Sequence, residues 1–518
     1  MRKGISMEEK WYKNKEIVFC VLLASLFFLL SFLLMLHHEP WRDETRPWIY
    51  ARGDYPMLDY IMTREFYGAT HPMDITGIYP SLLYHLGLSY ISYSITNILV
   101  MLASVILFLR YAPVSKFQKA LFVFGYYIFY EYNIIARSWS FSILFLFCIA
   151  VMYKDRFKKP IMYNMLLFLL ALTHIYVFIL AAILAALYYF ELFFPKVGIN
   201  AHSTMDTPSF TKKQILCLGL LIIGFSYIFY PNLNPKNVPE QFTEWNTEIS
   251  IKHLGTIPTA VIDAYLPIPK LQIEFWQTRG FSRALYGIPI FLATMLFFVN
   301  RIKPFLLYVA LCSSLFALFF FRAIAAFRHA GLLFIIFFFC LWIAKEYKEN
   351  ERWKITVSPK VLSSILIFLL LIQVIAAGIA FYYDWNYEFS SAERAASFLK
   401  ENGFLNNTTF IASYPSVEMV SILLRTPEYP KFYFMEYGEF RSFMVTDKKT
   451  YAFNDLPHPL TEFTEIIEKE TSNKGYLIVL LILDRKIDAS EEGAAQYELL
   501  AAFEESIITD KIFIYKKV

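Results

Sequence analysis

The apolar run 17–36 carries no charged side chain and has the length that an α-helix needs to cross a bilayer core of ~30 Å. Directly after it, residues 37–46 hold seven ionisable side chains. Five basic residues precede the run, so the positive-inside rule places the N-terminus in the cytoplasm and residues 37–46 outside. The run is longer than a usual signal-peptide core and lacks a following small-residue cleavage site, so we expect a retained first span.

The composition of the whole chain indicates a membrane protein. Of its 518 residues, 57% are hydrophobic and only 18% are charged, more apolar surface than a soluble domain hides. The net charge of +4 is small, and it is sorted between loops rather than gathered in one patch, so nucleic acid is not an expected partner. The five cysteines lie in apolar runs without paired spacing, which indicates neither a disulfide framework nor a zinc site.

Further apolar runs predict a polytopic α-helical protein with about eleven transmembrane helices. The expected spans are 17–36, 91–109, 120–133, 139–152, 161–171, 175–190, 215–230, 284–299, 305–320, 332–344 and 361–382. Lysine and arginine are concentrated in alternate loops, which we assign to the cytoplasm, and an odd number of spans places the C-terminus outside. Residues 1–386 form this membrane domain, with two long outer loops, 37–80 and 231–283, rich in aromatic residues and proline.

Residues 387–518 have the composition of a soluble domain. Ser390-Ser391-Ala392-Glu393 fits a capping box that opens a helix, and Gly403 would end it. Apolar runs at 409–412 and 476–483 alternate with amphipathic stretches at 460–470 and 494–503. This alternation predicts a small extracytoplasmic α/β domain with three layers. It contains no glycine-rich phosphate loop, so we expect a stabilising or acceptor-docking role for it.

The conspicuous polar residues at the ends of the apolar runs all fall on the outer side of this topology. They are Asp43, Glu44, His71, Arg137, His174, Arg322, Arg328 and His329. A transporter would be expected to place ionisable groups near the bilayer midplane. A site at the outer boundary instead suits chemistry on a lipid headgroup.

A carboxylate beside several arginines suits the transfer of a sugar from a lipid phosphate. The leaving phosphate needs charge neutralisation, and arginine offers a permanent cation with a planar donor fork. The incoming hydroxyl needs a base, which a carboxylate supplies. Asp43 would be the base, and Arg137, Arg322 and Arg328 would bind the phosphate. The alternative is that the arginines only meet lipid headgroups while Asp43 pairs with a neighbouring arginine.

Several short motifs, in this order and on one side, resemble the C-type glycosyltransferase superfamily. The similarity is to its protein O-mannosyltransferase and aminoarabinose-transferase branch. The motifs are Asp43-Glu44, His71-Pro72, Ala136-Arg137-Ser138-Trp139-Ser140, Thr173-His174-Ile175-Tyr176 and Arg328-His329. The resemblance covers most of the membrane part, and many members also carry a C-terminal periplasmic α/β domain. The chain departs from the family where His71-Pro72 continues as Met73-Asp74 rather than with further proline and aromatic residues.

The resemblance implies an inverting transferase of a bacterial inner (plasma) membrane. Its donor would be a polyprenyl-phosphate-linked sugar and its acceptor a glycan, lipid or protein. Asp43 would be the catalytic base, with Glu44 as a second catalytic residue or a structural support. The implied substrate-binding residues are Arg137, Arg328, Arg322, His71, His329 and His174, of which His174 is also explained as a satisfied polar residue at a helix end. Some relatives bind a divalent metal through this loop, so a metal stays an open alternative.

Two other functions remain open at this point. One is a transporter or flippase of a lipid-linked saccharide, which the lack of midplane charges and of internal repeats disfavours. The other is a non-catalytic envelope assembly protein that keeps the fold. A donor-transfer assay with and without the Asp43→Asn change separates a transferase from both.

Overall fold

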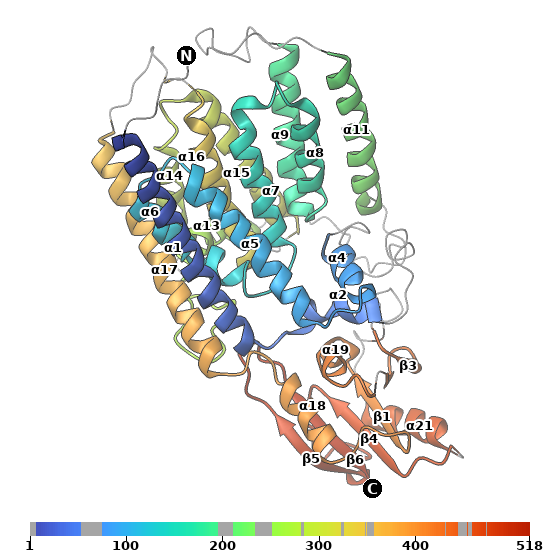
Figure 1. Ribbon diagram of the computed structural model, residues 1–518. Helices are drawn as coiled ribbons and strands as arrows, with labels where there is room; N and C mark the ends of the chain where they lie inside the picture. Colours follow the sequence, from blue (N-terminus) through green and yellow to red (C-terminus); the bar gives the residue numbers. More distant parts are fainter. Residues whose placement is uncertain are drawn as a thin grey trace.

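The computed structural model describes residues 7–52, 75–194, 211–233, 251–280, 284–322, 326–347, 349, 357–429, 431–443, 453, 458–472 and 474–518. Within these ranges, seven helices are long and apolar enough to cross a membrane. They are α1 (Met7–His37), α5 (Ile91–Tyr111), α9 (Ile175–Phe193), α11 (Lys212–Leu233), α15 (Ile302–Arg322), α16 (Phe327–Ala344) and α17 (Pro359–Asn386). The chain is therefore a mostly helical, polytopic membrane protein with a smaller C-terminal sheet region (Figure 1).

Four of the eleven expected spans are short helices in the structure. They correspond to α6 (Lys116–Val123) with the π-helical turn η1 (Tyr127–Glu131), α7 (Trp139–Met152), α8 (Pro160–Ala171), and η3 (Ala284–Tyr286) with α14 (Gly287–Met295). These helices lie in the same bundle as the long ones (Figure 1). Each is shorter than the about 20 residues that a helix needs to cross a bilayer. The structure therefore supports seven spans, and the count of eleven stays a prediction.

The expected outer loop 231–283 contains a helix that the sequence did not indicate. Within this range, α13 (Ile251–Tyr265) packs into the bundle, with Val261 and Tyr265 fully buried. The Tyr265 hydroxyl donates to the backbone oxygen of Leu333 on α16 at 3.2 Å. The helix contains charged residues and a proline, so its short apolar face did not stand out as a span in the sequence.

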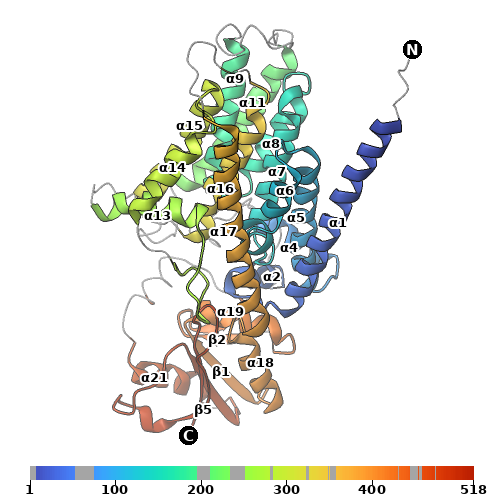
Figure 2. The same cartoon turned by 90° about the vertical axis from the view of Figure 1, so that its left-hand side faces the viewer.

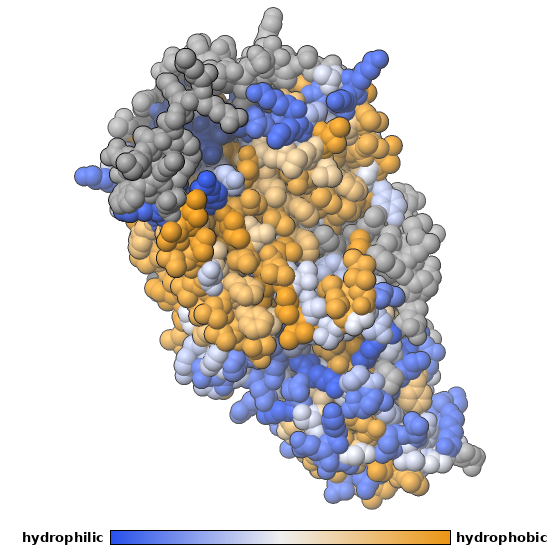
Figure 3. Space-filling model, viewed as in Figure 1, coloured by the Kyte–Doolittle hydropathy of each residue, from blue (hydrophilic) through white to orange (hydrophobic). Residues whose placement is uncertain are grey.

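The outer surface of the helical part is apolar. Figure 3 shows hydrophobic side chains over this part, with hydrophilic ones at both ends. On α1, for example, Val21 and Leu22 are 57% and 64% exposed. Exposing such a surface to water is unfavourable, whereas contact with lipid chains is not. The N-terminus and the C-terminal domain lie at opposite ends of the bundle (Figure 1).

The C-terminal domain is built on a six-stranded sheet with the order β3-β2-β1-β4-β6-β5. The strands are β1 (Thr409–Tyr414), β2 (Phe432–Phe434), β3 (Glu439–Arg441), β4 (Ile478–Leu483), β5 (Tyr497–Phe503) and β6 (Ile512–Lys517). Strand β1 runs parallel to β2 and β4, and the other pairs are antiparallel. Helices α18 (Ala392–Glu401) and α19 (Ser416–Arg425) cover one face and α21 (Leu460–Thr471) covers the other, which confirms three layers.

Two local expectations in this domain differ from the structure. The serine pair before α18 does not form a capping box; the Ser390 hydroxyl and the Ser391 backbone N–H instead donate to Asp510, at 2.6 and 3.0 Å. The stretch 494–503 is mainly strand β5 rather than a helix. Gly403 does end α18, with a positive φ of 67° that a side chain would disfavour.

The C-terminal domain rests on helix α2 (Arg42–Arg52), which follows the first span. Figure 2 shows α17 running along the bundle and leading into this domain. Ile49 of α2 packs into the hydrophobic core under α18 and α19. Arg425 of α19 donates to the backbone oxygen of Pro40 at 3.3 Å, and the Ser390 backbone N–H donates to Glu39 at the same distance. The domain therefore holds the polar segment after the first span in place.

Candidate functional site

Asp43 lies in the first turn of α2, among four guanidinium groups. Its Oδ2 atom is 3.0 Å from Nη2 of Arg137, and Oδ1 is 3.7 Å from Nε of Arg42. Burial opposes ionisation of Asp43, but the four guanidinium groups outweigh it and lower the pKa of this carboxyl group to about 2. The four groups belong to Arg137, Arg46, Arg328 and Arg42. One negative charge thus lies within a cationic cluster.

Glu44, the neighbouring residue, lies in a different environment and is only 1% exposed. Its Oε1 atom accepts the backbone N–H of Ala136 at 2.6 Å, and Oε2 accepts that of Trp41 at 3.2 Å. The ring of His38 approaches the same Oε2 at 3.1 Å. Both oxygens are therefore occupied by the protein. These contacts are those of a positioning residue that ties α2 to the segment carrying Arg137.

His38 continues this network toward α17. Its Nδ1 atom is 2.8 Å from Oδ2 of Asp384, and its Nε2 atom faces Glu44. Burial favours the neutral ring, but the two carboxylates outweigh it and raise the pKa of His38 to about 10. A protonated imidazolium between two carboxylates joins the end of α1, the start of α2 and the end of α17. The network therefore fixes the position of the first turn of α2, which carries Asp43.

Arg328 reaches the cluster from the first turn of α16. The segment beside it packs tightly, because the Tyr132 hydroxyl donates to the backbone oxygen of Arg328. A Cβ atom at Gly331 would come within 2.3 Å of the Tyr127 ring, so only glycine permits this approach of α16 to η1. The sequence expectation that Arg137 and Arg328 lie near Asp43 agrees with this geometry.

His174 and His329 lie together behind the cluster. The His329 ring stacks on Tyr176 at a centroid distance of 4.4 Å, and the His174 ring stacks on Trp139 at the same distance. The Nδ1 atom of His174 accepts the Tyr176 backbone N–H at 3.4 Å, as a cap of α9. His174 thus matches the expectation of a satisfied polar residue at a helix end.

The side chains of two expected site residues lie outside what the structure describes. Arg322 is the last residue of α15, and its side chain is not described. His71 lies in 53–74, outside the described residues. Within the described part of the chain, no group of three or more His, Cys, Asp or Glu side chains could hold a metal ion.

The cluster has more buried donor atoms than acceptors. Within the described ranges, Nε1 of Trp41, Nη1 of Arg137 and Nε of Arg328 are each buried without a hydrogen-bond partner. Trp41 is close to Arg137, whose guanidinium carbon lies 6.0 Å from the indole centroid. Buried donors without acceptors are costly, so such a group of them favours a site for an anion.

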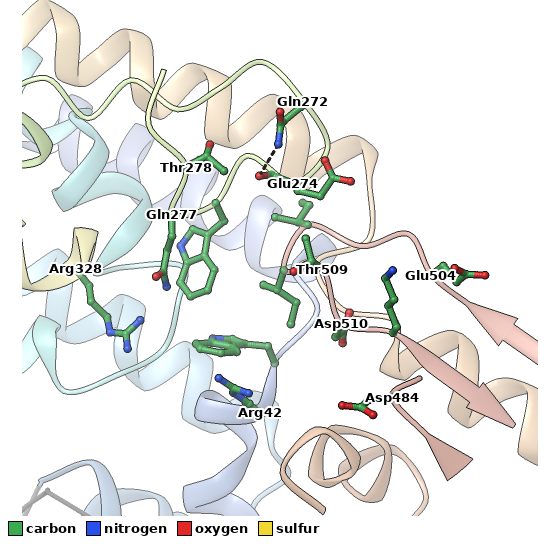
Figure 4. A pocket seen from close by; sticks show the side chains of 15 residues that line it. Arg42, Gln272, Glu274, Gln277, Thr278, Arg328, Asp484, Glu504, Thr509 and Asp510 are labelled. Carbon is green, nitrogen blue, oxygen red and sulfur yellow. Dashed lines mark hydrogen bonds between the residues drawn. The ribbon is translucent and has the colours of Figure 1, made fainter. Parts of the chain in front are cut away.

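A cavity of about 1030 Å³ opens from this cluster toward the C-terminal domain. Figure 4 shows Arg42 and Arg328 at one side of it and Asp484, Glu504 and Asp510 at the other. The cavity therefore adjoins the cluster around Asp43, and the docked domain forms one of its sides.

Sequence reasoning missed several residues that shape this site. Glu131 in η1 is buried, and its Oε2 atom accepts from the Tyr126 hydroxyl at 2.8 Å and from Trp276 Nε1 at 3.0 Å. A carboxylate inside the apolar run 120–133 was the available signal, since such groups are rare in membrane segments. Asp384, directly after the last apolar run, gave a similar signal.

No family model, no curated protein and no solved structure matches this chain. The resemblance to the C-type glycosyltransferases therefore stays a prediction.

Proposed function

We propose that this protein is a membrane glycosyltransferase that moves a sugar from a polyprenyl-phosphate donor to an acceptor on the outer face of the membrane. The observation that carries the proposal is the set of buried donors near the Asp43 carboxylate that have no hydrogen-bond partner: Trp41 Nε1, Arg137 Nη1 and Arg328 Nε. A lipid phosphate would supply the missing acceptors. It would also balance the excess positive charge.

The residues have distinct roles in the proposed reaction. The acceptor O–H bond breaks as its proton passes to a carboxylate oxygen of Asp43. The acceptor oxygen bonds to the anomeric carbon from the face opposite the phosphate, which inverts the configuration. The bond between the anomeric carbon and the phosphate oxygen breaks, and its electron pair stays on the phosphate. Arg137 and Arg328 stabilise the growing charge on that leaving group.

A pKa of about 2 makes Asp43 a weak base when the arginines have no other anion. A bound phosphate would share those guanidinium groups and offset their charge. The pKa of Asp43 would then rise in the donor complex, in the direction that a general base needs. Donor binding would thus activate the base, and donor-free protein would be inactive toward acceptors.

The fold that goes with this proposal is C-type glycosyltransferase-like, with about eleven spans and the N-terminus in the cytoplasm. The opposite positions of the N-terminus and the C-terminal domain in the bundle support this orientation (Figure 1). Reporter fusions after Lys15, Lys354 and Val518 are expected to report inside, inside and outside. A cytoplasmic signal at Val518 would contradict both the orientation and the site on the outer face. The bacterial inner membrane is the proposed location.

Replacing Arg137 or Arg328 by lysine is expected to weaken donor use about tenfold or more. Lysine keeps the positive charge but loses the planar fork that binds two phosphate oxygens. Transfer rates at limiting polyprenyl-phosphate sugar, measured in membranes, check this. Arg301→Lys is the matched control. Arg301 directly precedes the N-terminal end of α15 and pairs with Glu349 at 3.6 Å rather than with the cluster. Wild-type rates in both cluster variants would refute the phosphate site.

A further inference from the structure

The cavity beside the cluster continues well beyond the arginines. Arg42 and Arg328 line one side, and residues 504 and 507–511 of the C-terminal domain, with Asp484, line the other (Figure 4). The lining includes the carboxylates of Glu274, Asp484, Glu504 and Asp510. Lys511 is the cationic residue that the C-terminal domain adds to it. The lining therefore changes from cationic to mainly acidic across the cavity. A second ligand of different chemistry would fit the acidic side.

Two tryptophans stand in the wall of this cavity. The Trp41 and Trp276 rings meet edge to face with centroids 4.9 Å apart, and Glu131 holds Trp276 through its Nε1 atom. Trp41 and Trp276 are 4% and 8% exposed, so they offer the cavity a small apolar surface. Such a surface fits a ligand that has both an apolar face and hydroxyl groups.

The backbone of the cavity is strained on both sides. Gln277 and Thr509 have φ values of 58° and 60°, and they are the non-glycine residues with positive φ among the described residues. Both line this cavity, one from the loop before α14 and one from the turn between β5 and β6. Such conformations are strained for residues with a side chain and concentrate at ligand sites. Their position here favours a binding role for the cavity.

From the lining we infer that the cavity binds a saccharide acceptor next to Arg42 and Arg328, two of the arginines around Asp43. This inference rests on the proposed function. Sugar hydroxyls would donate to Asp484 and Glu504, and the C–H face of a ring would pack against the tryptophans. A lipid acceptor would need an apolar lining for its chains, whereas eleven of the fifteen lining residues are polar. The volume of about 1030 Å³ is at the upper end of ligand pockets and has room for more than one sugar ring.

Binding can be tested without any donor. The full-length protein in nanodiscs is titrated with cellobiose, mannobiose and diacetylchitobiose, with a serine- and threonine-containing hexapeptide and with glycerophosphoethanolamine, by saturation-transfer-difference NMR. We expect saturable binding of at least one disaccharide. Binding of the peptide or the headgroup instead, or of none of the probes, would overturn the inference.

Variants locate the disaccharide in the cavity. Asp484→Asn is expected to weaken its binding about tenfold, because a hydrogen bond to a charged group is lost. Asp488→Asn, four residues on and bonded to Ser490 rather than lining the cavity, is the control and should bind normally. Thr509→Gly relieves the positive φ, so it should fold at least as well while binding more weakly. Equal binding in all three variants would contradict the inference.

The same samples separate this inference from the proposed function. Farnesyl phosphate is used as a probe of the arginine cluster, with Arg137→Lys as its weakened variant. If farnesyl phosphate binds and no disaccharide does, the acceptor inference fails while the phosphate site stands. If a disaccharide binds and farnesyl phosphate does not, the lipid-phosphate donor fails while the saccharide site stands.

Discussion

The Asp43→Asn variant is expected to turn over about 10²- to 10⁴-fold more slowly than the wild type, because proton transfer by a positioned group is worth that much. Asparagine keeps the size of the side chain and cannot accept the proton. Donor binding should be unchanged or tighter, since the change removes a negative charge that lies 3.0 Å from Arg137. Single-turnover rates and donor affinity, measured on the same membranes, separate these two effects.

The pH profile gives an independent check on Asp43. Its carboxyl group has a pKa of about 2 in the free protein, below the ordinary 3.8, so it is ionised throughout pH 4–9. We therefore expect kcat/KM, which reports the free enzyme, to show no acidic limb from Asp43 in this range. Asp155→Asn, in the turn that follows the C-terminal end of α7, serves as the control for Asp43→Asn and should keep wild-type turnover. Loss of folded protein or of donor binding in Asp43→Asn would instead assign Asp43 a structural role.

The Glu44→Gln variant is expected to show the opposite pattern, a loss of stability rather than of chemistry. Glutamine places an amide N–H₂ against donors that now meet carboxylate oxygens, and it leaves His38 with one carboxylate partner. Breaking a buried, hydrogen-bonded charge pair costs about 3–5 kcal/mol. Thermal unfolding in detergent should therefore begin at a clearly lower temperature, while the protein that stays folded keeps turnover within about tenfold.

A second carboxylate–histidine pair provides the matched control for Glu44. Glu462 lies 2.8 Å from His458 on the C-terminal domain, but its side chain is 42% exposed. Exposed pairs contribute about 0–1 kcal/mol, so Glu462→Gln should leave the unfolding temperature almost unchanged. If Glu44→Gln were as stable as this control and lost turnover like Asp43→Asn, Glu44 would be catalytic rather than positioning.

The sequence by itself determined the class of this protein and the neighbourhood of its site. A bilayer imposes a length on every crossing helix and a cost on every buried charge, so uncharged runs such as 17–36 are recognisable one at a time. The same rule places polar residues at the ends of runs, which distinguishes Asp43, Arg137 and Arg328 in the sequence. The alternation in 387–518 predicted the three-layer domain because apolar residues recur with different periods in strands and in helices.

The tertiary structure alone decided which of these residues act together and how. Glu44 contacts Ala136, His38 contacts Asp384, and Glu131 holds Trp276, yet these partners are far apart in the sequence and share no local pattern. Hydropathy reports whether a segment is buried, not which segment it is buried against, because many packings of the same helices satisfy one apolar profile. The different environments of Asp43 and Glu44, and the cavity that the C-terminal domain lines on one side, follow only from that packing.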